Sequence, residues 1–111
     1  MVCIESKEIR FFDSMSGDGL SYMPIVLQCL QLEHAIKKRS PLTGNWKMVA
    51  MSDQIPKQNN TDDCGVFVCM YAEFSSRAAN EFSFKSTDMS LYRKLIAYEI
   101  LTGELYTEQK L

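Results

Sequence analysis

Residues 55–69 of the chain read IPKQNNTDDCGVFVC and place a cysteine where a polar loop meets an apolar segment. The polar residues end in Asp62-Asp63, Cys64-Gly65 follow, and the sequence then becomes nearly continuously apolar. A cysteine at the first turn of a helix faces backbone N–H groups and the positive end of the helix dipole. Such surroundings favour the thiolate, which is the nucleophilic form of the side chain. The stretch therefore predicts a central, buried helix whose first residue, Cys64, is a candidate nucleophile.

The helical interpretation of this segment depends on its length as well as on its pattern. The valines Val66 and Val68 would also suit a strand. Apolar residues continue through Phe74, and the following AEFSSRAA favours a helix that extends from Cys64 to about Ala78.

A second helix is predicted from about Tyr22 to Lys38, with Pro24 in its first turn, where proline is favoured. Its apolar residues form two stripes at helical spacing. A helix that is apolar on two sides is expected to be well buried. The first stripe contains Met23, Leu27 and Leu30, and the second contains Ile25, Cys29, Leu32 and Ile36.

The remaining elements predict a single small α+β domain. Residues 1–12 are typical of a β-hairpin with a tight turn at Ser6-Lys7, and Trp46 to Met51 of a strand. A last helix is expected from about Asp88 to Leu101, with Gly103 closing it.

Composition limits the classes of function. Apolar residues make up 46% of the 111 residues and charged residues 23%, as in a globular protein, and the net charge is −2. No basic stripe with interleaved aromatic residues supports nucleic-acid binding. No apolar run is long enough for a membrane span, and no signal peptide is visible, which favours the cytosol or nucleus. The spacing of the four cysteines matches no zinc site, so neither a metal nor a cofactor is expected.

A cysteine nucleophile needs a base, a group that orients the base, and donors for an oxyanion. Asp13 follows an apolar strand at its exposed end. Gln58 lies six residues before Cys64, in a loop that could fold back toward the helix N-terminus. The backbone N–H of Cys64 and the Gln58 amide could together bind an oxyanion. The structural alternatives are a buried, inert thiol at Cys64 and an ordinary turn residue at Asp13.

Three segments resemble the C-terminal half of the ubiquitin-like-specific proteases, the SUMO (sentrin-specific) protease family. FFDSM at residues 11–15 is similar to the family's aromatic-aromatic-Asp-Ser stretch. IPKQNNTDDCGVFVC resembles its Pro-Gln-Gln-x-Asn-x-x-Asp-Cys-Gly pattern, with Lys57 in place of the first glutamine. STDMSLYRKLIAYEIL at residues 86–101 is similar to its last helix.

The resemblance implies a papain-like cysteine protease fold and assigns roles to three residues. Cys64 would be the nucleophile, Asp13 would orient the base, and Gln58 would serve the oxyanion hole. The implied reaction is hydrolysis after the terminal Gly-Gly of SUMO, or of another ubiquitin-like protein such as a NEDD-like protein or ubiquitin. A non-catalytic module that binds such a protein without cleaving it is the alternative.

The catalytic histidine that the resemblance implies is not visible in the sequence. In the family it belongs to a His-Trp pair on the strand before the Asp strand. The predicted hairpin pairs Met1 with Phe12, so the residue facing Asp13 is expected upstream of Met1. Residues 1–111 are therefore predicted to be an incomplete catalytic domain that cleaves little or nothing and is poorly soluble or partly unfolded alone. His34, the single histidine, is interpreted as a helix residue at the core margin or in solvent.

Overall fold

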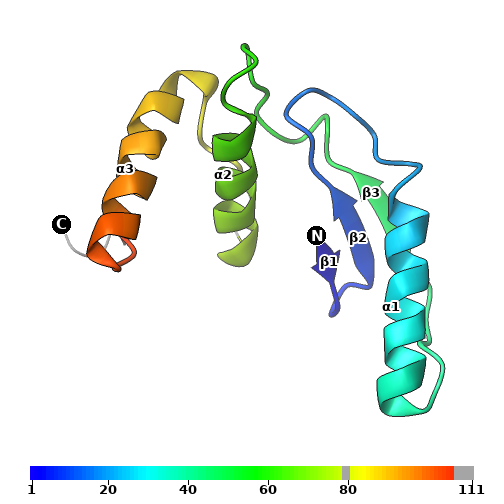
Figure 1. Cartoon of the computed structure of the whole chain (residues 1–111). Coiled ribbons are helices and arrows are strands. Elements are labelled where there is room, and N and C mark those ends of the chain that lie inside the picture. Colours follow the sequence, from blue (N-terminus) through cyan, green and yellow to red (C-terminus); the bar gives the residue numbers. More distant parts are fainter. Residues whose placement is uncertain (79–80, 107–111) are drawn as a thin grey trace. The chain divides into compact units, whose positions relative to one another are not determined.

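The computed structural model describes residues 1–78 and 81–106, and its contacts divide the chain into two compact units. The first unit comprises residues 1–55 and contains a small sheet and one helix. The second comprises residues 56–111 and contains a pair of helices (Figure 1). This content of strands and helices confirms the predicted α+β class.

The sheet of the first unit has three strands in the order β1-β2-β3. β1 (Val2–Cys3) pairs antiparallel with β2 (Glu8–Phe11), which pairs in parallel with β3 (Lys47–Ala50). Parallel neighbours need a crossover, and α1 (Met23–Lys38) provides it and packs against β2 (Figure 1). The chain therefore leaves β2 at Phe11, enters α1 at Met23 and returns to the opposite end of the sheet.

The hairpin forms as predicted, but its register differs by two residues. Val2 pairs with Ile9 and Cys3 with Glu8, whereas the predicted tight turn paired Ile4 with Ile9. The connection is a longer turn in which the Lys7 N–H donates to the Ile4 carbonyl at 3.3 Å and Lys7 adopts a φ of 53°. A two-residue hairpin turn needs special backbone conformations that Ser-Lys does not favour. Because the shift is even, each side chain keeps its face of the sheet.

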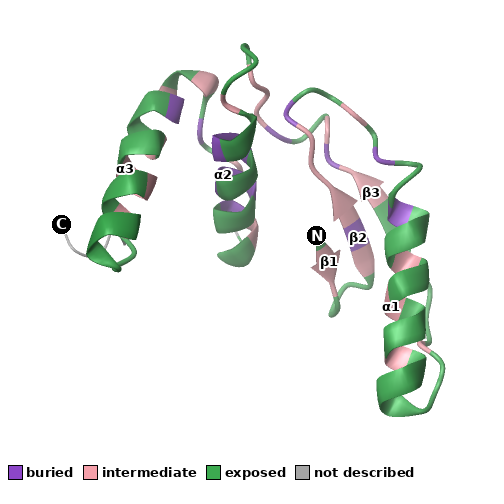
Figure 2. Cartoon of the chain, in the orientation of Figure 1, coloured by how far each residue is buried: buried purple, intermediate pink, exposed green. Residues whose placement is uncertain are grey.

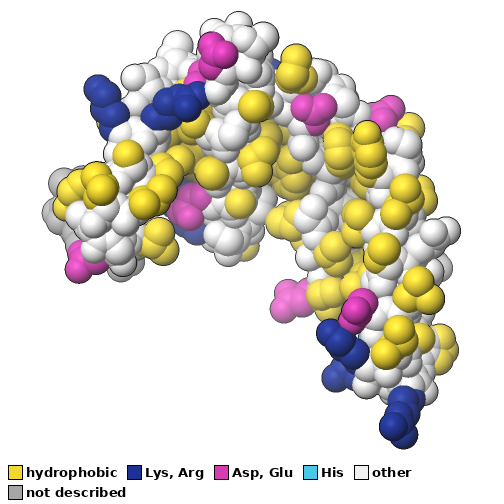
Figure 3. Space-filling model, in the orientation of Figure 1, with side chains coloured by type: hydrophobic (Ala, Val, Ile, Leu, Met, Phe, Trp, Pro, Cys, Tyr) yellow, Lys and Arg dark blue, Asp and Glu magenta, His cyan; other side chains and the backbone are white. Residues whose placement is uncertain are grey.

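The prediction that α1 is well buried is wrong. Figure 2 shows most of the helix as exposed, and Met23 is its one buried residue. The stripe that contains Leu27 and Leu30 is half-buried, whereas the second stripe is exposed, with Leu32 at 65% and Ile36 at 74%. Figure 3 shows hydrophobic side chains on the surface of this helix. The sheet contacts α1 on one side only, so the second apolar stripe of this helix has nothing to pack against within the unit.

The second unit is built around α2 (Cys64–Ser76), the helix with the most buried residues. A short 3₁₀ turn, η1 (Ser86–Asp88), leads into α3 (Met89–Thr102), which packs against α2. Aromatic rings fill the space between these elements, and their centroids lie 5.2–6.5 Å apart, a normal spacing for favourable ring contacts. The core rings belong to Phe67, Tyr71, Phe74, Phe82, Phe84 and Tyr92.

Each predicted helix and strand is confirmed in type. Gly103 ends α3 with a φ of 69°, as expected for a C-terminal glycine. In the described residues no helix is long and apolar enough to span a bilayer. Within the same ranges, no three His, Cys, Asp or Glu side chains gather as metal ligands would.

Candidate active site

Cys64 is the first residue of α2, as the sequence predicts. Its side chain is exposed and forms no disulfide, so the thiol is not buried, contrary to the structural alternative. The first helical bond runs from the Phe67 N–H to the Asp63 carbonyl, at 3.0 Å. The N–H groups of Cys64 and Gly65 precede that bond, and like those of any first helical turn they lack partners four residues back. An exposed thiol thus stands beside backbone donors at the positive end of a helix.

The other three cysteines have apolar neighbours in the sequence, which predicts that they are core residues, but none of them is buried. Cys29 on α1 and Cys69 on α2 are exposed, and Cys3 on β1 is half-buried. Whether such a residue is buried depends on which side of its helix or strand the neighbouring elements cover. Cys64 is thus distinguished by its place at the helix start and not by exposure alone.

Gln58 lies in the loop of residues 56–63 that leads into α2, and its side chain is half-buried. Its Nε2 donates to the Asn60 carbonyl at 2.5 Å. This contact fixes the amide inside the loop that ends at Cys64. The structure therefore places Gln58 and Cys64 in the same unit, on either side of the turn at Asn60.

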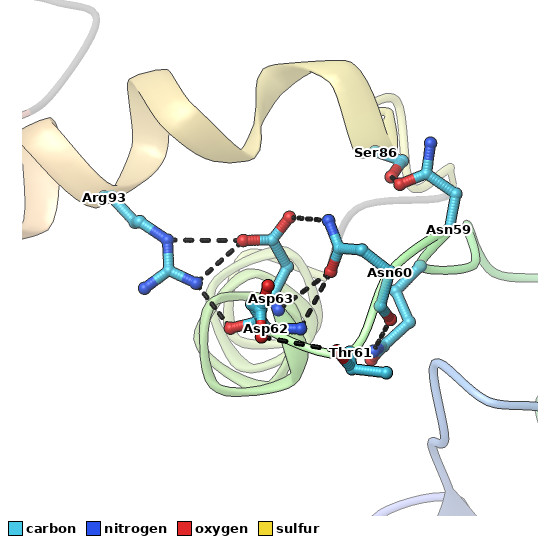
Figure 4. A network of polar contacts seen from close by, with 8 residues as sticks. Asn59, Asn60, Thr61, Asp62, Asp63, Ser86 and Arg93 are labelled. Atoms are coloured by element: carbon cyan, nitrogen blue, oxygen red, sulfur yellow. Dashed lines mark hydrogen bonds and ion pairs between the residues drawn. The ribbon is translucent and has the colours of Figure 1, made fainter.

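The loop is organised by Asn60 (Figure 4). Asn60 Oδ1 accepts the backbone N–H groups of Asp62 and Asp63, at 3.0 and 3.1 Å. Asn60 Nδ2 donates to Asp63 Oδ2 at 2.7 Å. Asparagine often closes such turns by bonding to nearby backbone groups. The result is a closed turn that directly precedes the helix start.

Arg93 of α3 holds the end of this loop. Its Nε and Nη2 donate to Asp63 Oδ1, at 3.2 and 2.7 Å, and Nη2 also donates to the Asp62 carbonyl at 2.5 Å. The Asp63 carboxylate therefore makes no side-chain cap of α2 and is turned to its partners, as expected if it is not to oppose a thiolate at Cys64. The Asn60 amide and then the Arg93 guanidinium hold the pKa of Asp63 below its usual value. These contacts are thus present at neutral pH and weaken as the pH falls through that lowered pKa.

Sequence reasoning did not identify Arg93, Asn60 and Asp63 as parts of one site. Arg93 is 30 residues from Asp63, and no spacing rule connects a loop with one face of a later helix. The one signal that linked them was the resemblance of both segments, residues 55–69 and 86–101, to the same protease family.

Asp13 follows β2 in the first unit and is half-buried. Its Oδ1 accepts the Met15 N–H at 2.8 Å, and its Oδ2 accepts the Gly17 N–H at 2.9 Å. A Cβ at Gly17 would lie 2.3 Å from that Oδ2, so glycine permits the close approach. These are the contacts of a turn residue, yet each carboxylate oxygen has a further lone pair with which to accept another donor. The geometry therefore fits both a turn role and the orientation of a base.

His34 does not lie near Asp13. It is half-buried on α1, and its Nδ1 is 3.0 Å from the Ser40 carbonyl at the end of that helix. The chain runs from Asp13 into α1 at Met23, and His34 is eleven residues further along, roughly 16 Å at 1.5 Å per residue. Its interpretation as a helix residue at the core margin is confirmed.

Comparisons with known proteins identify the family to which the chain belongs. The profile of the Ulp1 protease family, C-terminal catalytic domain, matches residues 1–105. Sentrin-specific protease 2 of Homo sapiens is 36% identical over 107 residues, which cover 95% of this chain and 18% of that protein. A sentrin-specific protease of Caenorhabditis elegans is 35% identical over 100 residues, 89% of this chain and 14% of that protein.

Sentrin-specific protease 5 of Mus musculus is 31% identical over 99 residues, which cover 89% of this chain and 13% of that protein. The chain thus spans less than a fifth of the length of these relatives. The matched residues 1–105 contain the positions Asp13, Gln58, Cys64 and Arg93. The chain belongs to the Ulp1 protease family and matches its C-terminal catalytic domain.

Proposed function

We propose that these residues are part of the catalytic domain of a papain-like cysteine protease that cleaves after the terminal Gly-Gly of a SUMO-type modifier. The observation that carries the proposal is the exposed Cys64 at the first turn of α2, in a chain that belongs to the Ulp1 family. The names of the relatives, which are sentrin-specific, favour a SUMO-type substrate over ubiquitin or a NEDD-like protein.

In the proposed reaction, the Cys64 thiolate attacks the carbonyl carbon of the modifier's last glycine. The carbonyl oxygen becomes an oxyanion, which accepts hydrogen bonds from the Cys64 N–H and the Gln58 amide. The C–N bond to the substrate lysine then breaks, and the amine leaves with a proton from the general acid. Water hydrolyses the resulting thioester, which releases the modifier and restores the thiol.

Gly65 supports a catalytic interpretation of the helix start. A Cβ at this position would meet no atom within 4 Å among the described residues, and its φ is not positive. Neither packing nor backbone conformation therefore calls for glycine here, although glycine costs a helix about 0.5–1 kcal/mol relative to alanine. Absence of a side chain beside Cys64 would instead let the substrate's main chain approach closely.

The general base of the proposed reaction is a histidine oriented by Asp13, and it is not His34. His34 lies at the far end of α1 from Asp13 and is paired with the Ser40 carbonyl. We propose that the histidine belongs to sequence outside residues 1–111. The comparison that tests this is between residues 1–111 and the extended chain, which adds the sequence encoded upstream of Met1.

Residues 1–111 alone are expected to react very slowly with an electrophilic probe built on a SUMO tail, and the extended chain quickly. General acid–base help contributes about 10²–10⁴-fold, and the isolated residues lack it. Labelling is followed by the mass shift of the protein, and the His34→Ala variant of the extended chain should react as fast as its parent. Rapid labelling of residues 1–111 that disappears in His34→Ala would show that His34 is the base. An extended chain that binds SUMO without cleaving it would favour the non-catalytic module.

Replacing Gln58 by alanine in the extended chain is expected to lower kcat by about 10²–10³-fold, the usual effect of losing one oxyanion donor. The loss occurs in the transition state, so KM should change little. Steady-state cleavage of a SUMO precursor measures both constants. Gln54→Ala, an exposed glutamine outside the loop, is the matched control. An unchanged kcat in Gln58→Ala would exclude Gln58 from the oxyanion hole.

A further inference from the structure

The loop of residues 56–63 is tied to the helices of its own unit at three points. The Tyr71 hydroxyl of α2 donates to the Pro56 carbonyl at 2.6 Å. The Ser86 hydroxyl of η1 donates to Asn59 Oδ1 at 2.6 Å. Arg93 of α3 binds the end of the loop, at Asp62 and Asp63 (Figure 4). The loop before Cys64 is therefore held between α2 and the segment of η1 and α3.

Of these three contacts, the one that Arg93 makes involves the loop residues nearest to Cys64 in sequence. Asp63 directly precedes Cys64, and its carbonyl accepts the first helical bond of α2. One guanidinium binds both the carboxylate of Asp63 and the main-chain carbonyl of Asp62. The planar guanidinium presents its donors in a rigid fork, so this contact sets an orientation as well as a distance. Any movement of the loop end would turn the Cys64 N–H.

The same network extends to Gln58. Asn60 donates to the other oxygen of the Asp63 carboxylate, and its own carbonyl accepts the Gln58 amide. A continuous chain of contacts thus connects Arg93, through Asp63 and Asn60, with Gln58. Both proposed oxyanion donors therefore depend on the position of one carboxylate.

We propose that Arg93 is a positioning residue, which holds the Cys64 N–H and the Gln58 amide in the geometry of the oxyanion hole through Asp63 and Asn60. This inference rests on the proposed protease function. The Asp63 side chain is 13% exposed, whereas that of Arg93 is 50% exposed. Ion pairs with a solvent-exposed partner usually stabilise a fold little. The pair is therefore expected to affect the reaction more than the folding of the domain.

The test is Arg93→Ala in the extended chain. A small displacement of catalytic groups can cost roughly 10²-fold in rate, so kcat for a SUMO precursor should fall by about 10–10²-fold with KM nearly unchanged. Arg93→Lys keeps the charge but not the fork, and should restore only part of kcat. Lys94→Ala removes a neighbouring cation of α3 that makes none of these contacts to the loop, and should leave kcat as it is.

Alkylation of Cys64 by iodoacetamide separates positioning from loss of the fold. This reaction displaces iodide at a saturated carbon and forms no oxyanion. Its rate should therefore stay within about twofold in Arg93→Ala while kcat falls, since the oxyanion donors serve only acyl transfer. Amide hydrogen exchange should become faster in residues 59–65 of the variant, because the loop loses its tie.

Each alternative result has a distinct meaning. An unchanged kcat in Arg93→Ala would overturn the inference while leaving the protease function in place. So would a fall in kcat that is matched by an equal fall in iodoacetamide reactivity, or by an equal effect of Lys94→Ala. An extended chain with no turnover before any substitution would instead overturn the proposed function, and the inference with it.

Discussion

Replacing Cys64 by serine in the extended chain is expected to abolish cleavage of a SUMO precursor. The proposed mechanism forms a thioester at this side chain, and a serine hydroxyl is scarcely ionised at neutral pH without a base matched to it. When several catalytic residues act together, loss of the nucleophile lowers kcat by at least about 10⁴-fold. Formation of the mature modifier that ends in Gly-Gly, followed by mass spectrometry, measures the effect. Affinity for SUMO should persist, because the exchange of sulfur for oxygen leaves the surface unchanged.

Cys69→Ser is the matched control for this substitution. Cys69 lies on the same helix and is also exposed, but it is more than one turn away from the helix start. The control should retain the parental kcat and the parental rate of labelling. Turnover that survives in Cys64→Ser, or that disappears in Cys69→Ser, would contradict the assignment of the nucleophile.

Replacing Asp13 by asparagine is expected to have the second-largest effect, a fall in kcat of up to about 10⁴-fold, because the base would be held in the wrong tautomer. The same substitution puts an amide N–H₂ where Asp13 now accepts two backbone N–H groups, from Met15 and Gly17. One of those bonds would be lost, so the melting temperature is expected to fall as well. Cleavage kinetics and thermal unfolding of the extended chain must therefore be measured together.

Asp18→Ala separates the two effects of the Asp13 substitution. Asp18 lies in the same connection between β2 and α1, and its Oδ1 accepts the Leu20 N–H at 3.0 Å. Alanine has no side-chain acceptor, so this control loses one turn contact without touching the proposed base. A variant Asp13→Asn that loses no more activity than Asp18→Ala would reduce Asp13 to a turn residue.

The sequence by itself was sufficient to predict the helices and the place of Cys64, the proposed nucleophile, at the start of one of them. Apolar spacing along residues 64–76 and the polar loop before them predict a helix that starts at Cys64, and the structure confirms that start. Pro24 and Gly103 mark helix ends through their own backbone preferences, which neighbouring elements do not change. Such helix ends can be predicted from the sequence because their cause lies in the residue itself.

Tertiary structure alone decided the hairpin register, the exposure of the second stripe of α1 and the contact of Arg93 with the loop before Cys64. The register depends on the turn that Ile4 to Lys7 adopt, which the pattern of strand residues does not specify. Burial of an apolar stripe depends on whether another element covers it, and the sheet contacts only one side of α1. The contact of Arg93 with Asp63 joins positions 30 residues apart. It exists because packing of α2 against α3 sets a guanidinium beside the loop that precedes Cys64, and no short-range pattern encodes that meeting.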